Sequence, residues 1–278
     1  MPNIEQQRMR AEAFRALHRG PRALLLPNVW DVASARVIQQ AGFPAIATTS
    51  AGIAFSLGYP DGEKISRDEM LEVVARITSS VTVPVTADVE SGYGPRPEDA
   101  ARTAEAVINA GAIGMNLEDG TEDPEHPLVD LSLQLEKIAA VREAARKSAV
   151  PLVLNARTDV YLRGVGAEGG RYDETVHRLS AFRDTDADCV FAPGLKEANT
   201  IKRLVSDLRC PLNILAGPGC PPIAELEQLG VARVSLGSAP MRATLGLLRR
   251  ITNELKSTGT YQSLAGAPPH AEVNRLME

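Results

Sequence analysis

The sequence predicts an α/β protein: a (β/α)8 barrel of the TIM type with a C-terminal helical arm. Short runs rich in Val, Ile, Leu and Ala recur along the chain, and a segment with helical periodicity follows each of them. Eight such units in strict alternation favour a closed barrel over an open sheet. The length of 278 residues suits one barrel, since this fold typically takes about 250 residues. We therefore predict a single domain over residues 1–278.

Near-continuous apolar runs mark the expected strands. Runs such as Leu24-Leu25-Leu26 are typical of parallel strands that are buried on both faces. The predicted strands are Ala23–Val29, Phe43–Ser50, Val83–Glu90, Ala112–Glu118, Pro151–Thr158, Asp188–Ala192, Leu212–Ala216 and Arg233–Leu236.

The segments between the strands carry helix start signals. Ser66 is placed as an N-cap, and Glu69 stands at the capping-box position three residues later. Further helices are predicted to begin near Pro97, Leu131, Asp173, Lys196, Pro222 and Pro240.

Glycines and prolines mark helix ends and the end of the chain. Gly42, Gly111 and Gly230 each follow a predicted helix, where a left-handed residue commonly ends the helix. Residues 258–278 contain Gly266, Pro268 and Pro269 close together and are predicted to be a tail, or an arm that packs on another subunit.

Composition restricts the class of protein. Hydrophobic residues form 44% of the chain but aromatic residues only 4%, so the core must consist of Ala, Val, Leu and Ile, which fill barrel interiors. The net charge of −5 argues against a nucleic-acid partner. No apolar run approaches the ~20 residues that span a bilayer, and the N-terminus lacks the apolar core of a signal peptide. These features predict a cytoplasmic protein with no membrane partner.

Acidic residues gather where two neighbouring strands are expected to end. The third strand ends with Asp88 and Glu90, which share one face of the strand, and the fourth ends with Glu118 and Asp119. Active sites of such barrels lie at the carboxyl ends of the strands. Carboxylates that point together need a cation or a proton, and a site with oxygen ligands only favours Mg²⁺ or Mn²⁺. The alternative is that these acids cap helices or lie in solvent.

A basic residue completes this end of the predicted barrel. Arg157 ends the fifth strand within Asn155-Ala156-Arg157-Thr158-Asp159. Its planar guanidinium could bind a substrate carboxylate through two hydrogen bonds. The alternative is a structural ion pair with Asp159 or Glu118.

Several motifs together resemble the isocitrate lyase/phosphoenolpyruvate mutase superfamily, which includes 2-methylisocitrate lyases and phosphoenolpyruvate phosphonomutases. They are Asp88–Gly94 (DVESGYG), Leu117–Asp119 (LED), Asn155–Asp159 (NARTD) and Leu57–Asp61 (LGYPD). The resemblance extends over nearly the whole chain. It implies a barrel that is commonly tetrameric, with the last helix often swapped onto a neighbouring subunit. It also implies a homo-oligomer here, a tetramer or a dimer.

The resemblance assigns roles to particular residues. It implies a Mg²⁺ (or Mn²⁺) site in which Asp88 is the inner ligand and Glu90, Asp61 and Glu118 are further acids. It implies that Arg157 binds the substrate, with Glu118 beside it as a second catalytic residue. The strand-two loop that holds a substrate carboxylate or phosphonate corresponds to Thr49, Ser50 and Ala51.

This chain departs from the family pattern at the residues that set the reaction. Glu90 replaces the usual aspartate. The loop Gly120–Pro127 contains neither the lysine and cysteine of the lyases nor the lysine and asparagine of the mutases. Phe191–Gly194 stands where the lyases have a glutamate. His126 could replace the missing acid or base, or it could be an inert surface residue.

These observations predict a Mg²⁺-dependent lyase or decarboxylase. It would cleave a carbon–carbon bond of an isocitrate-like or oxaloacetate-like acid, a small-molecule carboxylate, through an enolate intermediate. One alternative is carbon–phosphorus chemistry like that of a phosphoenolpyruvate phosphonomutase or a phosphonate hydrolase. Another is a barrel that binds a carboxylate without turning it over.

Overall fold

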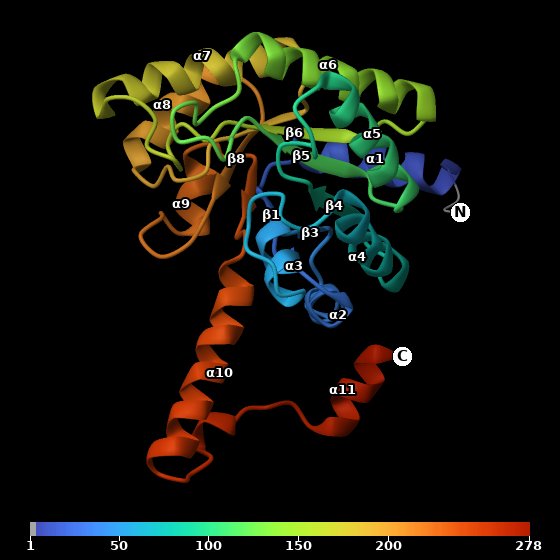
Figure 1. The fold of residues 1–278 in the computed structure, drawn as a ribbon, viewed down its shortest axis with the longest axis vertical. Helices are drawn as coiled ribbons and strands as arrows, with labels where there is room; N and C mark the ends of the chain where they lie inside the picture. The colour runs from blue at the N-terminus through green and yellow to red at the C-terminus, as the bar shows by residue number, and fades with distance from the viewer. Residues whose placement is uncertain (1–3) are drawn as a thin grey trace.

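A parallel β-barrel forms the centre of the protein, as predicted (Figure 1). The computed structural model describes residues 4–278. Its strands follow the order β1-β9-β8-β7-β6-β5-β4-β3-β2, and every neighbouring pair is parallel. They are β1 (Leu24–Leu26), β2 (Asn28–Val29), β3 (Ile46–Thr48), β4 (Val85–Asp88), β5 (Gly114–Glu118), β6 (Val153–Arg157), β7 (Cys189–Phe191), β8 (Leu212–Leu215) and β9 (Arg233–Ser235).

The first predicted strand closes the barrel in two pieces. Residues 23–29 were expected to form one strand, but Pro27 separates β1 from β2. β1 pairs with β9 and β2 pairs with β3, so the two halves join the ends of the sheet. Proline has no N–H to donate, yet its carbonyl accepts a hydrogen bond from the Ala47 backbone N–H at 3.2 Å. The nine short strands therefore occupy eight strand positions.

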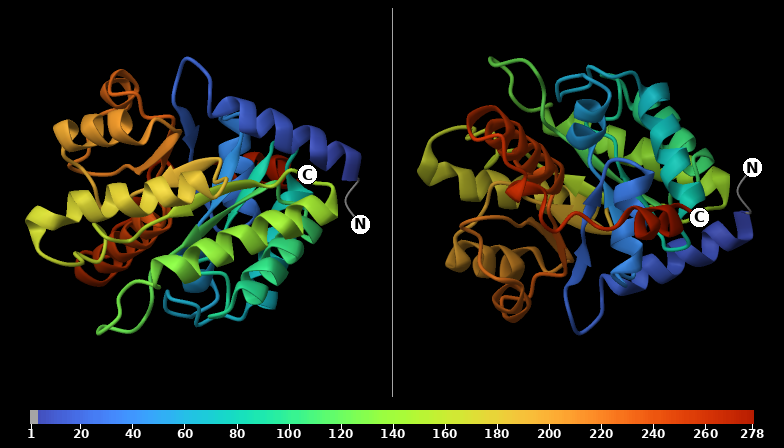
Figure 2. Two further views of the ribbon diagram at one scale, coloured as in Figure 1. Left: turned by 90° about the horizontal axis from the view of Figure 1, so that it is seen from above. Right: turned by 90° about the horizontal axis from the view of Figure 1, so that it is seen from below.

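Residues 4–278 contain eleven α-helices, and most of them surround the barrel (Figure 2). They are α1 (Ile4–Leu17), α2 (Val32–Gln40), α3 (Ser50–Ser56), α4 (Arg67–Ser80), α5 (Pro97–Asn109), α6 (Leu131–Ser148), α7 (Arg171–Asp184), α8 (Ala198–Leu208), α9 (Ile223–Gln228), α10 (Ala239–Ser257) and α11 (His270–Met277), with short 3-10 turns η1 (Glu168–Gly170) and η2 (Gln262–Leu264). None of the helices in residues 4–278 is long and apolar enough to cross a membrane.

The sequence signals for helix ends are confirmed. Ser66 caps α4, and its side chain and that of Glu69 form both hydrogen bonds of a capping box. Gly42, Gly111 and Gly230 all have positive φ angles, between 85° and 87°. The starts of two helices differ by two residues from the prediction. α7 begins at Arg171 instead of Asp173, and α8 begins at Ala198 instead of Lys196.

The second predicted strand is shorter than expected, which changes the setting of its last residues. Phe43–Ser50 was predicted as a strand, but β3 ends at Thr48. Thr49 is the N-cap of α3, and its hydroxyl accepts a hydrogen bond from the Gly52 N–H at 3.3 Å. Threonine readily caps a helix in this way, which outweighs its preference for strands. Ser50 is therefore a helical residue.

Helix α1 covers the amino ends of three strands. The Gln7 side chain donates to the carbonyl of Ala112, just before β5, at 2.8 Å. Arg15 donates to the carbonyl of Pro151, just before β6, at 3.2 Å, and forms an ion pair with Asp188, just before β7, at 2.6 Å. Phe14 is completely buried between this helix and the barrel. The opposite, carboxyl end of the barrel is left for the site.

The C-terminal segment forms the predicted helical arm. Helix α10 extends away from the barrel, and the chain then turns back through η2 to α11 (Figure 1). α11 lies beside α2 of the same chain, where Arg36 donates to the carbonyl of Leu276 at 2.9 Å. Leu245, Leu248 and Leu255 on α10 are exposed. Packing of this arm on another subunit remains a prediction.

Candidate active site

The predicted acids and Arg157 come together at the carboxyl ends of β4, β5 and β6. In the barrel register, Asp88 lies opposite Asn116, and Glu118 lies opposite Arg157. Side chains in register on adjacent parallel strands point to the same side, here the barrel interior. The arrangement agrees with the expectation that strand-end residues of neighbouring strands meet.

Asp88 is held by three donors from two neighbouring elements. Its Oδ2 accepts hydrogen bonds from the backbone N–H and the hydroxyl of Ser50, at 3.1 and 3.0 Å. Its Oδ1 accepts one from the side-chain amide of Asn116 at 3.1 Å. The side chain is fixed in direction although 8% of the residue is still exposed to solvent. Oδ1 therefore has a lone pair that remains free for a further ligand.

Glu90 lies in the turn that follows β4, with a positive φ of 52°. One carboxylate oxygen accepts a hydrogen bond from the backbone N–H of Glu63, and the other, Oε1, is buried without a partner in the described residues. Burial, together with the charges of Asp61 and Asp88, raises the pKa of Glu90 to about 8. A carboxylate with an unsatisfied buried oxygen is costly unless a proton or a cation compensates it.

Glu118 and Arg157 form an ion pair at the mouth of the barrel. Nη1 of Arg157 lies 2.5 Å from Oε2 of Glu118. The Nε and Nη2 of the same guanidinium contact both oxygens of Asp159 at 2.6 and 3.0 Å. Because Arg157 is shared between two acids, burial still raises the pKa of Glu118 well above its ordinary range. Three of the five N–H groups of Arg157 are engaged in this way, which leaves two for a ligand.

Asp61 lies on the loop after α3 and is exposed. Partial desolvation and the negative charge of Asp88 raise its pKa. The acidic side chains at this end of the barrel therefore extend from Asp88 and Glu90 to Asp61.

The predicted carboxylate-binding segment borders Asp88. Thr49 caps α3, Ser50 donates its two hydrogen bonds to Asp88, and Ala51 is buried in the first turn of the helix. The structure brings Ser50 together with the acids. Thr49 and Ala51 flank Ser50 at the start of α3.

The loop after β5 is anchored by Asp119 and crosses the edge of the site. Asp119 is completely buried, and its carboxylate accepts hydrogen bonds from the Thr158 hydroxyl at 2.6 Å and the Asp159 N–H at 2.9 Å. It also forms an ion pair with Arg178 at 3.2 Å. The second acid of the Glu-Asp pair thus ties the loop after β5 to the loop after β6.

His126 lies on the outer side of this loop. Its side chain is 79% exposed, and Nδ1 is 3.0 Å from Oδ2 of Asp123. It does not line the cavity beside the acids. The structure therefore does not bring His126 together with the other predicted site residues, and its catalytic role remains a prediction.

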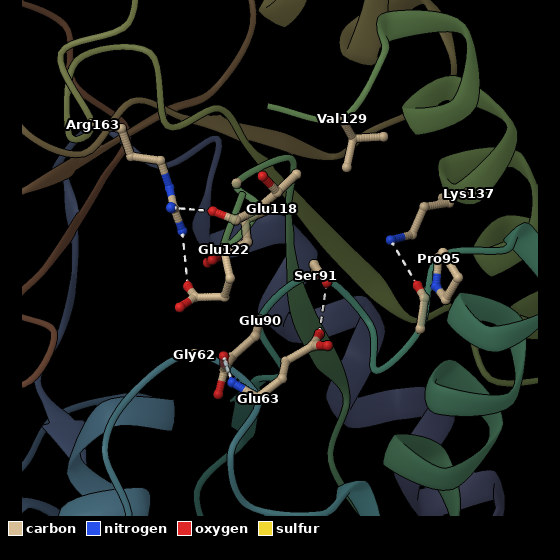
Figure 3. A pocket seen from close by; sticks show the side chains of 13 residues that line it. Gly62, Glu63, Glu90, Ser91, Pro95, Glu118, Glu122, Val129, Lys137 and Arg163 are labelled. Atoms are coloured by element: carbon tan, nitrogen blue, oxygen red, sulfur yellow. Dashed lines mark hydrogen bonds and ion pairs between the residues drawn. The ribbon is translucent and has the colours of Figure 1, made fainter. Parts of the chain in front are cut away.

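A cavity of about 310 Å³ opens between the loops after α3, β4 and β5 (Figure 3). Glu90 and Glu118 line it, together with Glu63, Lys137 and Arg163, which the sequence did not single out. The carboxylate of Glu63 accepts hydrogen bonds from the Ser91 hydroxyl at 2.7 Å and the Tyr93 N–H at 2.8 Å. It thus holds the turn that carries Glu90.

Two cations face this cavity from opposite sides (Figure 3). Lys137 on α6 is 1% exposed and donates to the carbonyl of Gly94 at 3.2 Å, and burial lowers its pKa. Arg163 contacts Asp159 at 3.1 Å and Glu122 at 3.7 Å. The helical spacing offered a signal for Lys137, because it shares the buried face of α6 with Gln134, Ile138 and Val141.

The donor set fits a hard divalent cation held mainly through Asp88. No group of three or more His, Cys, Asp or Glu side chains in residues 4–278 forms a ready-made metal cage. Glu118 is turned toward Arg157, and Glu90 toward Glu63. Magnesium usually takes one or two carboxylates and retains several waters, so a complete cage is not required. The free lone pair of Asp88 and the unpartnered Oε1 of Glu90 are the observations that favour such an ion.

Comparison with known proteins decides the family. Residues 14–256 match the family described as phosphoenolpyruvate phosphomutase. The chain belongs to this family. Its membership of the isocitrate lyase/phosphoenolpyruvate mutase superfamily is thereby confirmed, and with it the prediction that the protein is an enzyme, a lyase of this superfamily.

The alignments with individual relatives extend over almost the whole chain. The 2-methylisocitrate lyase of Escherichia coli K12 is 27% identical over 91% of this chain and 86% of its own. A Burkholderia cenocepacia J2315 crystal structure described as a lyase/mutase has a TM-score of 0.92 with 41% identity, and covers 98% of this chain and 96% of that one. A phosphonopyruvate hydrolase crystallised with oxalate and Mg²⁺ has a TM-score of 0.83 with 25% identity, and covers 96% of this chain and 94% of that one.

Proposed function

We propose that the protein is a Mg²⁺-dependent lyase that cleaves a carbon–carbon bond of a small α-oxo or 2-hydroxy diacid through an enolate. The observation that carries this proposal is the acid cluster around Asp88 beside Arg157. It lies at the carboxyl end of the barrel, where enzymes of this fold have their active sites. Relatives of the chain include 2-methylisocitrate lyases and oxaloacetate decarboxylases. A phosphonopyruvate hydrolase of similar fold was crystallised with oxalate and Mg²⁺.

Asp88 is proposed as the direct metal ligand, with Glu90, Asp61 and Glu118 as the surrounding acids. The ion would supply a Lewis acid that stabilises the negative charge of an enolate. Ser50 and Asn116 keep the Asp88 carboxylate in one orientation. This preorganisation avoids a reorientation cost during the reaction.

Arg157 is proposed to bind a substrate carboxylate with its two remaining N–H groups. Its bonds to Glu118 and Asp159 fix the plane of the guanidinium, so these groups point in a set direction. The segment Thr49, Ser50 and Ala51 at the start of α3 would hold the carboxylate from the other side. The cavity of about 310 Å³, which is lined by Glu118, the ion-pair partner of Arg157, would accommodate a small diacid.

The loop after β5 lacks the lysine, cysteine and asparagine of the family's lyases and mutases. This difference favours a reaction other than theirs. The residues from Thr121 to Val129 that line the cavity include neither a lysine nor a cysteine. Glu90, Glu118 and Lys137 line the cavity and have shifted pKa values, so they are the proposed acid and base groups for a diacid bound there.

A turnover screen tests this proposal. Purified protein is incubated with Mg²⁺ and, in separate reactions, with oxaloacetate, isocitrate-like and 2-methylisocitrate-like acids, substituted malates and phosphonopyruvate. Products are identified by mass spectrometry. Asp88→Ala serves as the inactive control, and chelated protein shows whether the metal is needed. Cleavage of a diacid supports the proposal. Cleavage of the phosphonate alone assigns the protein to carbon–phosphorus chemistry, and no turnover favours a barrel that only binds a carboxylate.

A further inference from the structure

Arg233 lies in the interior of the barrel beneath the acid cluster. It occupies the first position of β9, opposite Leu24 on one side and Asn213 on the other. The residue is 1% exposed. Its guanidinium carbon is 6.0 Å from the centre of the Phe14 ring, at the end of the barrel that α1 covers. The side chain therefore stands between the covered amino end and the site.

The charge of Arg233 is buried without an ion pair in the described part of the chain. Its Nη2 is 3.5 Å from Oδ1 of Asn116, and its Nε and Nη1 have no hydrogen-bond partner among residues 4–278. Burial lowers its pKa to about 10. By contrast Arg142, a buried arginine of α6, contacts Asp188 at 2.5 Å. A buried cation without a counter-ion costs stability, and functional sites are where such costs are expected.

Asn116 connects Arg233 to Asp88. Its Oδ1 accepts a hydrogen bond from Nδ2 of Asn155 at 2.8 Å and faces Nη2 of Arg233. Its Nδ2 donates to Oδ1 of Asp88 at 3.1 Å. All three partners are buried, so solvent does not compete for these bonds.

Arg233 and Asp88 fix the orientation of the Asn116 amide from opposite sides, because a guanidinium carries donors only and a carboxylate acceptors only. Two facing asparagine side chains can exchange their oxygen and nitrogen positions together and keep one hydrogen bond between them. Oδ1 of Asn155 has no partner in the described residues, so Asn155 does not resist such an exchange. A guanidinium carries donors only, so Arg233 requires the oxygen of Asn116 to face it. The amide nitrogen then points at Asp88.

We propose that Arg233 is a positioning residue for the metal site, which acts through Asn116 to fix the direction of the Asp88 carboxylate. This inference rests on the proposed function, because it concerns the residue assigned as the direct metal ligand. Ser50 holds one oxygen of Asp88 and Asn116 holds the other. Loss of Arg233 removes one of the two charged groups that orient the amide of Asn116, so the second oxygen of Asp88 is less well aimed at the ion. Groups that orient metal ligands from behind typically change metal affinity by 10–100-fold.

The test is Mn²⁺ affinity, measured by calorimetry on metal-free protein. Wild type is compared with Arg233→Met, Arg233→Lys, Asn116→Leu and the Arg233→Met/Asn116→Leu double variant. We expect each of the two uncharged single variants to bind Mn²⁺ at least about 10-fold more weakly. The double variant should bind Mn²⁺ no more weakly than Asn116→Leu alone, because Arg233 acts through Asn116. Arg233→Lys should recover part of the affinity.

Thermal unfolding of the metal-free variants separates this role from a structural one. Arg233→Met removes a buried charge with two unpartnered nitrogen atoms, so its midpoint should equal or exceed that of wild type. A lowered midpoint with unchanged Mn²⁺ affinity would show that Arg233 only supports the core. Tighter Mn²⁺ binding would show that it acts as a repelling charge, and either result overturns the inference. Absence of Mn²⁺ binding by wild type would instead contradict the proposed function, and the inference with it.

Discussion

Ser50 donates both its backbone N–H and its hydroxyl to the same oxygen of Asp88, at 3.1 and 3.0 Å. This contact joins the segment that the sequence assigned to substrate binding to the residue that it assigned to the metal. The first turn of α3 and the end of β4 therefore behave as one unit. A change at either residue should affect both metal and carboxylate binding.

Asp88→Ala should abolish metal-dependent ligand binding while leaving the fold intact. Among the predicted ligands, Asp88 is the only carboxylate that accepts three hydrogen bonds and still has a free lone pair, and the substitution removes it. Calorimetric titration with Mn²⁺ measures the first effect, and circular dichroism the second. Asp68→Ala, on an 89% exposed side chain of α4, is the matched control and should bind as wild type does. Unchanged metal affinity in Asp88→Ala would remove Asp88 from the site.

Asp159→Ala should destabilise the protein by about 3–5 kcal/mol, the usual effect of removing one partner of a buried ion pair. Asp159 is completely buried and contacts Arg157 at 2.6 Å and Arg163 at 3.1 Å. Urea unfolding measures the change. Glu72→Ala breaks the exposed pair with Arg76 and should cost less than about 1 kcal/mol. Equal effects in the two variants would contradict the importance of burial here.

His18 should make the protein less stable as the pH falls from about 6.5 to about 4. Burial, and then the charge of Arg233, lower the pKa of His18 from 6.5 to about 4. Between these values the unfolded chain binds the proton and the folded protein does not, so folding weakens with decreasing pH and levels off below about 4. The shift corresponds to about 3 kcal/mol, at 1.36 kcal/mol per unit.

Urea unfolding of wild type and His18→Gln at pH 7 and pH 4 checks this expectation. The variant should lose about 3 kcal/mol less stability between the two pH values than wild type does. His126→Gln, which changes an exposed histidine, should follow wild type. The same loss in wild type and His18→Gln would rule out His18 as the source.

The position of the site could be predicted because it depends on a simple rule of the fold. Asp88, Glu118 and Arg157 each end an apolar run, and the carboxyl ends of parallel strands meet at one edge. The partners of Arg157 could not be chosen in advance. Glu118 and Asp159 were both named as possible structural partners, and the structure shows that the guanidinium contacts both.

Other features depend on contacts between distant segments. The single sequence gave no reason to connect Arg233 with Asn116, which are 117 residues apart. Lys137 was overlooked because a lysine in an amphipathic helix is usually exposed. Thr49 was assigned to a strand because it follows an apolar run, whereas its capping bond to Gly52 begins a helix.

The arm should assemble the protein into a homo-oligomer. Leu245, Leu248 and Leu255 recur on one side of α10 and are between 44% and 55% exposed. Leu248→Asp should therefore shift the protein toward the monomer, which light scattering after gel filtration would detect. Ile4→Asp, at another exposed apolar residue, should leave the mass unchanged. A monomeric wild type would contradict this expectation.

Calorimetric titration with oxalate, a mimic of the enolate, tests whether a metal ion held by Asp88 binds an enolate. The titration is carried out with and without Mg²⁺ on wild type and on Asp88→Ala. We predict tight oxalate binding by wild type that requires the metal and is lost in the variant. Binding that is equal with and without Mg²⁺, or no binding at all, would contradict a metal site that stabilises an enolate.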